Sequence, residues 1–238
     1  MNNTIEPLSL FSIILAMIPV LIVLAIIWKW KVGYQTAQYA VLRMLIQLFM
    51  IGYFLAYIFE TDNAAIIVAL LLLMVTVASW IALRTSKVSQ WALFHKSILA
   101  MAVGGGSVLV LITQGTLKLQ PWYLPAYMVP LAGMIFANAM NGISLSLERL
   151  EAEVDRGESY EVARVLALRA ALIPVINSLF AVGLVSLPGM MTGQILSGVE
   201  PFIAARYQIM VMCMLFGSTG ISVTLFLVLV KSNFHTHQ

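Results

Sequence analysis

Seven long apolar runs, each with at most one charged residue, divide the sequence and limit what it can fold into. A transmembrane helix needs about 20 mostly apolar residues, because each residue adds about 1.5 Å across a hydrocarbon core of about 30 Å. Strands of a membrane barrel would alternate apolar and polar residues over about ten positions, whereas these runs are continuous. The sequence therefore predicts an all-α, polytopic transmembrane helix bundle with spans at residues 8–28, 34–59, 64–83, 97–115, 123–147, 170–188 and 207–230.

Composition supports the same fold class. Hydrophobic residues make up 61% of the 238 residues and charged residues only 10%, against about 25% charged residues in a soluble domain. This balance excludes a cytosolic globular enzyme, a disordered chain and a secreted disulfide scaffold. The first run lacks the basic residues that precede the apolar core of a cleaved signal peptide, so we retain it as a span. No linker interrupts the runs, and we expect one transmembrane domain over residues 1–238.

Lysine and arginine predict the orientation, because cytoplasmic connections of membrane proteins are enriched in them. With the N-terminus outside, the outer connections hold only Lys118 and Arg206. The inner side then holds Lys29, Lys31, Arg43, Arg84, Lys87, Lys96, Arg149, Arg156, Arg164, Arg169 and Lys231. We therefore predict an N-out, C-in multi-pass membrane protein, with the lipid bilayer as its main surroundings.

The predicted inner segment 148–169 holds six acidic residues and four arginines. Apolar residues recur at helical spacing on both sides of Gly157, at Leu147, Leu150, Val154, Val162, Val165 and Leu166. The pairs Arg149–Glu153 and Glu153–Arg156 have the spacing of helix ion pairs. The pattern predicts one or two amphipathic cytoplasmic helices broken at Gly157. Such a segment is either a solvated face between two spans or a docking element for a soluble partner.

A second unusual segment, residues 186–201, has a proline near each end, three glycines and one acidic residue. It is too apolar for a free loop and too broken for a straight helix. Irregular backbone at membrane depth is tolerated only where it is buried in protein or lines a wet cavity. We therefore predict a broken or re-entrant segment.

Several kinds of chemistry are missing from the sequence. It has no Gly-x-x-x-x-Gly-Lys-[Ser/Thr] motif to bind nucleotide phosphates, so any ATP belongs on a partner subunit and no cofactor is expected on this chain. No predicted span contains the histidine that an intramembrane Ser–His hydrolase needs as a base. The tail residues His235 and His237 are better explained by a frayed terminus than by a metal site. No basic stripe indicates nucleic acid, and we expect no enzyme.

Polar residues inside spans are costly and therefore informative. Arg43 and Gln47 share one face of the second span, where Arg43 either anchors the helix at the inner boundary or lines a path. Asn138 and Asn141 in the fifth span either form interhelical hydrogen bonds or line a path for a polar substrate. Gly104–Gly106 indicates close helix packing or a hinge.

The methionine positions are weaker evidence for a binding site. Met134, Met140, Met190 and Met191 lie in or beside these polar segments. Most methionines in an apolar chain fill space, although a thioether is also a soft metal ligand, better suited to Cu(I) than to iron. Composition alone gives no metal identity.

Two stretches are similar to signatures of the FetB family: PLAGMIFANAMN at residues 130–141 and GLVSLPGMMTGQ at residues 183–194. Shorter similarities occur at residues 43–47, 52–53, 169–174 and 207–211. The family comprises membrane subunits of ABC transporters, including bacterial iron exporters, and plant aluminium-tolerance proteins are its relatives. The resemblance covers most of the chain.

The resemblance implies a membrane-spanning permease subunit that exports a metal ion, iron, with energy from a separate P-loop ATPase subunit. Two permeases and two ATPases would form the working unit. Its candidate substrate-path residues are Met134, Asn138, Asn141, Met190, Met191, Gln194, Arg43 and Gln47. Its candidate ATPase-coupling residues are Glu148, Glu151, Arg156, Glu161, Arg164 and Arg169.

One departure keeps an alternative open. Family members carry a Leu-Gly-Ala-x-Pro stretch in the cytoplasmic segment that is missing here, and the segment is shorter. An ATP-independent secondary carrier or a membrane assembly protein is the alternative function.

Overall fold

The computed structural model describes residues 9–234, which form helices and no named strand. Seven helical segments are long and apolar enough to cross a membrane, which confirms the predicted fold class. The predicted first span begins one residue before the described part, and His235 and His237 also fall outside it. The chain divides into two compact units, Met1–Glu60 and Thr61–Gln238, described separately below. The expectation of a single domain and the orientation in the bilayer stay predictions.

Unit 1 is a helical hairpin of α1 (Leu10–Ala16), α2 (Ile18–Lys29) and α3 (Tyr34–Phe59). The first span is two helices end to end, because Pro19 in the first turn of α2 has no N–H to continue the ladder of α1. The turn before α3 contains Lys31 and Gly33 in left-handed conformations, with φ of 57° and 61°. No residue of α2 is buried. A helix that is apolar all round is suited to lipid.

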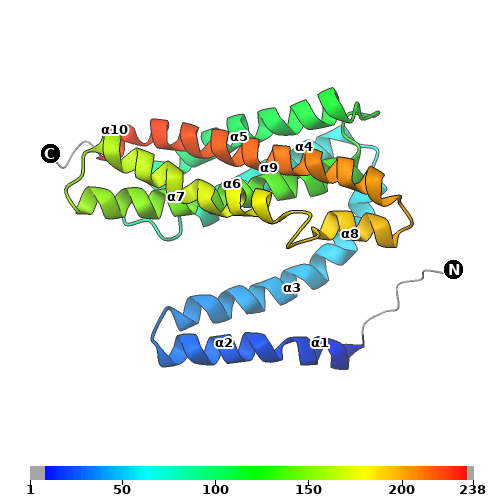
Figure 1. Cartoon of the computed structure of the whole chain (residues 1–238), viewed down its shortest axis with the longest axis horizontal. Helices are drawn as coiled ribbons and strands as arrows, with labels where there is room; N and C mark the ends of the chain where they lie inside the picture. The colour runs from blue at the N-terminus through cyan, green and yellow to red at the C-terminus, as the bar shows by residue number, and fades with distance from the viewer. Residues whose placement is uncertain (1–8, 235–238) are drawn as a thin grey trace. The chain divides into compact units, whose positions relative to one another are not determined.

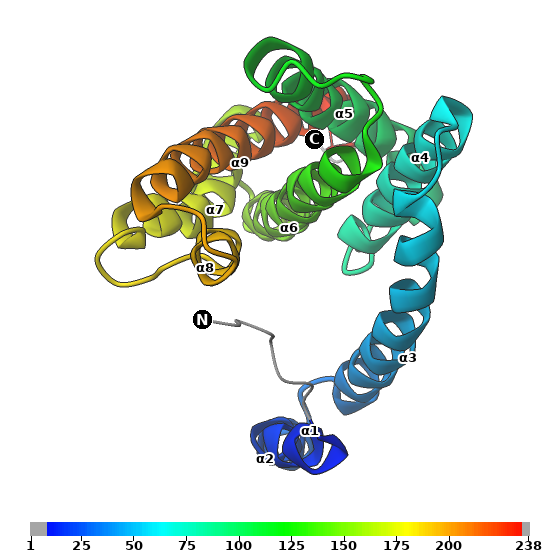
Figure 2. The ribbon, with the colours of Figure 1, turned by 90° about the vertical axis from the view of Figure 1, so that its right-hand side faces the viewer.

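Unit 2 is a bundle built around α6 (Pro125–Asp155), which packs against four other helices (Figure 2). These are α4 (Ala64–Ala82), α5 (Gln90–Val110), α7 (Tyr160–Ala181) and α9 (Pro201–Leu229). A π-helical turn, η1 (Leu111–Thr116), extends α5. The short helices α8 (Gly189–Leu196) and α10 (Lys231–Phe234) lie near the two ends of α9 (Figure 1).

Glycines let the central helices approach closely. A Cβ at Gly104 of α5 would lie 2.6 Å from Ser222 Oγ and 2.7 Å from the Ser222 backbone nitrogen in α9. A Cβ at Gly142 of α6 would lie 2.8 Å from Thr219 Cγ2. A Cβ at Gly105 would lie 2.8 Å from Ile135 Cγ2, whereas a Cβ at Gly106 would meet no neighbouring atom within 4 Å. The glycine triplet therefore serves close packing at two of its three positions.

Several helices are longer than the predicted spans. The helix α6 continues through the charged residues to Asp155, and α7 begins at Tyr160 instead of residue 170. The segment 148–169 is therefore not a separate helix but the extended ends of α6 and α7, joined by a turn in which Gly157 has a φ of 92°. Charges mark where a chain leaves the hydrocarbon, and the backbone hydrogen-bond ladder continues beyond that point.

The predicted apolar stripe of this segment is right in α6 and wrong in α7. Leu147 and Leu150 are fully buried. In α7, however, Val162 and Val165 are exposed, and the buried face consists of Tyr160, Ala163, Ala167, Ala171 and Val175. Small alanine side chains bring α7 close to its neighbours, which bulkier valines would prevent.

The segment 186–201 is broken, as predicted. The helix α8 has only eight residues, with Pro188 as its N-cap. Gly198, with a φ of 90°, follows its end and begins the turn into α9. Whether this segment re-enters the bilayer stays a prediction.

Candidate functional site

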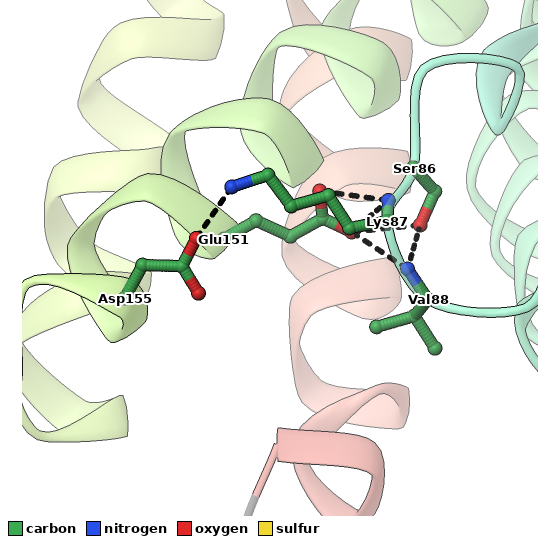
Figure 3. A network of polar contacts seen from close by, with 5 residues as sticks. All are labelled: Ser86, Lys87, Val88, Glu151 and Asp155. Carbon is green, nitrogen blue, oxygen red and sulfur yellow. Dashed lines mark hydrogen bonds and ion pairs between the residues drawn. The ribbon is translucent and has the colours of Figure 1, made fainter.

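The ion pairs of unit 2 involve residues at or near one end of its helices, and we call this end the charged end; its backbone is at the left of Figure 1. It contains the α4–α5 loop, the α6–α7 turn and α10. At its centre the Glu151 carboxylate, only 5% exposed, holds the α4–α5 loop (Figure 3). Glu151 Oε1 accepts a hydrogen bond from Ser86 Oγ at 2.7 Å, and both carboxylate oxygens accept from the Lys87 N–H at 3.1 Å. The Val88 N–H points to the same carboxylate at 3.5 Å.

A second contact joins the same loop to α6. Lys87 Nζ donates to Asp155 Oδ2 in an exposed ion pair (Figure 3). The hydrogen bond to Asp155, then its negative charge, raises the pKa of Lys87 above its ordinary 10.5. The loop is thus fixed to the end of α6 by one buried carboxylate and one exposed pair.

Further pairs connect the remaining elements of this end. Arg149 and Arg156 both contact the buried Glu153 carboxylate, at 2.6 and 2.9 Å, so both predicted ion pairs form. Lys231 lies 2.7 Å from Glu161, which connects α10 to α7. The Tyr160 hydroxyl donates to the Leu227 carbonyl and joins α7 to α9.

The candidate coupling residues lie on α6 and α7 and form two groups. Glu151, Arg156, Glu161 and Arg164 all have partners inside the chain; Arg164 lies 2.5 Å from Glu161. Glu148 and Arg169 are exposed, and among residues 9–234 neither has a hydrogen-bond or ion-pair partner. These two remain available to a partner molecule.

The other half of unit 2 contains uncharged cavities. A central cavity of about 320 Å³ lies between α6, α7, α8 and α9 and is lined by Met134, Asn138, Met190 and Gln208, among others. A first side cavity of about 260 Å³ shares Met134 and Met190 with it. A second side cavity of about 360 Å³ shares Gln208, Val182 and Met212 with it. The thioethers and the Gln208 amide therefore stand at the boundaries between adjoining cavities.

Gln208 is the most unusual polar residue of this region. Its side chain is only 5% exposed, yet its Oε1 has no hydrogen-bond partner among the described residues. A buried acceptor left unpaired costs about 1–3 kcal/mol. Sequence reasoning missed Gln208 as a site residue, although it is a polar residue in an uncharged run and the argument applied to Asn138 also applies to it.

The predicted path residues are only partly brought together. Met134, Asn138 and Met190 line the central cavity, and Met191 lines the second side cavity. Asn138 Nδ2 donates to the Met134 carbonyl at 2.9 Å, which leaves Oδ1 without a partner in the described chain. Asn141 is exposed and lines none of the three cavities.

The remaining predicted path residues are not among those that line the central cavity. Gln194 lies on α8, and its buried Oε1 has no hydrogen-bond partner among the described residues. In unit 1, the Gln47 amide oxygen, when turned toward Arg43, accepts from Nε at 3.0 Å and from Nη2 at 3.3 Å. These two residues share one helix face as predicted, and their part in a path stays a prediction.

Ionisable metal ligands are not clustered in the described chain. Among residues 9–234, no three His, Cys, Asp or Glu side chains are grouped as for a metal ion. A larger cavity of about 690 Å³ at the unit 1 turn is lined by Trp28, Lys29 and Lys31, a combination typical of interfacial anchors. The central cavity with its unpaired amide oxygens is therefore the better candidate for a polar substrate.

Comparison with known proteins identifies the family. The model of the uncharacterised protein family UPF0014 matches residues 10–235. The chain belongs to the UPF0014 family. Its resemblance to FetB is also confirmed: the Escherichia coli K12 "Probable iron export permease protein FetB" is 35% identical over 228 residues, which cover 89% of this chain and 86% of that one.

Other UPF0014 relatives are as similar. The membrane protein YjkA of Bacillus subtilis is 34% identical over 247 residues, covering 95% of this chain and 96% of its own. The Arabidopsis thaliana "Protein ALUMINUM SENSITIVE 3" is 32% identical over 200 residues, covering 77% and 71%. No solved structure matches. The chain is an integral, multi-pass membrane protein of the UPF0014 family.

Proposed function

We propose that this chain is the permease subunit of an ABC-type transporter that exports a metal ion, iron, across the bacterial inner membrane. The observation that carries the proposal is the central cavity, where Asn138, Gln208 and three methionines present uncharged donor atoms between membrane-spanning helices. Polar groups at such depth are costly and mark substrate pathways. The name of the Escherichia coli relative, an iron export permease, supports the choice of cargo.

The energy would come from a separate ATPase subunit. The chain has no phosphate-binding loop of its own. Glu148 on α6 and Arg169 near the middle of α7 are exposed and have no partner in the described chain. The paired residues of the charged end fix the loop and helix ends to one another. A soluble ATPase docking there would contact a rigid surface.

The helix α6 offers the mechanical connection. It is 31 residues long and contributes Met134 and Asn138 to the central cavity and Glu148 and Glu151 to the charged end. ATP-driven movement of the α6–α7 turn would be transmitted along this helix to the cavity. In the proposed cycle the cavity opens alternately inward and outward, within an assembly of two permeases and two ATPases.

Cellular iron content tests the function. A bacterial strain without this gene is loaded with iron, and total iron is measured by mass spectrometry with and without the wild-type gene. Iron should be higher in the deleted strain and return to normal on complementation. Equal iron contents would overturn the export proposal.

Purification from native membranes tests the partner. A P-loop ATPase should co-purify with the wild-type chain, and Arg169→Glu should lose it. Lys118→Glu, an exposed change on the predicted outer side, is the matched control and should keep it. Export that survives ATP depletion but stops with a proton uncoupler would instead support the ATP-independent carrier.

A further inference from the structure

We propose that Met134, Met190 and Gln208, with Asn138, form a binding subsite for a soft, low-valent metal ion. This inference rests on the proposed function and deepens it, because it names the class of ion that the permease accepts. It concerns the form of the metal: a soft monovalent ion such as Cu(I) or Ag(I) is bound best, a ferrous ion, which is borderline, less tightly, and Fe(III) or Al(III) least.

The thioethers supply the first argument. Met134 comes from α6 and Met190 from α8, and both line the central cavity and the first side cavity. Met212 lines the central cavity as well. Thioether sulfur binds soft ions and offers little to hard ones. Their unbranched side chains can turn toward either cavity.

The amide oxygens supply the second argument. Gln208 Oε1 is buried beside these methionines and receives no hydrogen bond within the described chain. Asn138 uses its Nδ2 to contact the Met134 carbonyl, so its Oδ1 remains as an acceptor. A cation satisfies a buried, unpaired acceptor as well as a hydrogen-bond donor does, and the oxygen in turn replaces part of the ion's hydration shell.

The missing charge supplies the third argument. No Asp, Glu, Lys, Arg or His lines any of these three cavities, all of which are formed by described residues. Hard cations such as Ca²⁺ and Mg²⁺ are bound through carboxylates, and a buried ion without an opposite charge is strongly disfavoured. This penalty rises steeply with ionic charge, so it is smallest for a monovalent ion, larger for a divalent ion and largest for a trivalent ion.

Direct binding measurements test the subsite without transport. The full chain carries Cys213→Ser in every sample, because the free thiol of Cys213 at the second side cavity would itself bind the probe. It is purified with any subunit that accompanies it and dialysed against Ag(I), a soft monovalent probe, and separately against Al(III). Bound metal is counted by mass spectrometry. Wild-type protein should bind Ag(I) and not Al(III). Met134→Leu and Met190→Leu keep the volume, and each should weaken Ag(I) binding about tenfold or more, the loss that even an outer-shell change causes.

A matched control excludes an indirect effect of methionine loss. Met214 is buried in α9 but lines none of the three cavities, so Met214→Leu should bind Ag(I) like the wild type. Gln208→Leu should also weaken binding, and Gln208→Glu should add measurable Al(III) binding, because a carboxylate supplies the missing charge.

The outcomes separate this inference from the function. If Ag(I) binding is equal in the wild type and in both methionine variants, or if Al(III) binds as tightly, the subsite is wrong even where cells still export iron. If the variants lose Ag(I) binding as expected but deletion leaves iron content unchanged, the subsite stands and the export proposal fails.

Discussion

The two halves of unit 2 treat polar groups in opposite ways. At the charged end, the buried carboxylates of Glu151 and Glu153 are surrounded by donors, and most charged side chains there contact an opposite charge. In the cavity half, Gln208 Oε1 and Asn138 Oδ1 are left without partners inside the described chain. A buried polar group that is fully paired holds structure together, whereas an unpaired one carries a free-energy cost that a ligand can remove.

The largest expected effect comes from Glu151→Ala. The change leaves the Ser86 hydroxyl and the Lys87 N–H without their acceptor and frees the α4–α5 loop. We expect a loss of about 3 kcal/mol in the free energy of unfolding, because hydrogen bonds to a charged group are the strong ones. Unfolding of the purified chain in detergent measures it.

Glu148→Ala is the matched control, three residues away on the same helix. Glu148 is exposed and has no partner in residues 9–234, so its removal should change stability by less than about 0.5 kcal/mol. Equal losses for the two variants would show that the charged end is not held by Glu151.

Gln208→Leu should act in the opposite direction. Removing an unpaired buried oxygen should leave stability unchanged or raise it by about 1 kcal/mol, while iron export falls. Ser218→Ala on the same helix removes a buried hydroxyl that donates to the Leu215 carbonyl at 3.3 Å. This control should lower the free energy of unfolding by about 1 kcal/mol and leave iron export unchanged. A clear loss of stability in Gln208→Leu would show that Gln208 stabilises the fold, which contradicts this prediction.

The smallest effect is expected for Lys87→Met, because the Lys87–Asp155 pair is exposed and such pairs contribute little. The folded protein raises the pKa of Lys87 above 10.5. The pair therefore contributes its full stabilisation at neutral pH and loses it as the pH rises through that raised pKa. Unfolding midpoints of the wild type and variant should converge at strongly alkaline pH and at high salt. A difference that grows with pH would contradict this.

The sequence predicts the spans well because the bilayer imposes a length of apolar residues that any chain must meet. It predicts helix ends poorly. The helix α6 continues to Asp155 because alternating charges such as Arg149 and Glu153 pair along one face and support further turns. The structural break is Gly157, which was visible in the sequence, whereas the start of α7 at Tyr160 was not.

The site was predictable only in part. Met134, Asn138 and Met190 do line one cavity, whereas Asn141 does not. Seven residues bring Asn141 back to within about 20° of Met134 around the helix, but they also place it about 10.5 Å further along the axis. Gln208 reaches the same cavity from α9. Its position in the same cavity as residues of α6 and α8 depends on how helices distant in sequence pack, and a local sequence pattern does not contain this information.

Met134 and Met190, at the boundary between two cavities, also bear on timing. An unbranched side chain changes rotamer within picoseconds to nanoseconds where it has room, whereas helices shift over microseconds to milliseconds. The methionine side chains at this boundary would therefore change rotamer many times during a single helix movement. The pace of a transport cycle would then be set by the backbone and its energy source, and the residence time of the ion by the affinity of the sulfur atoms.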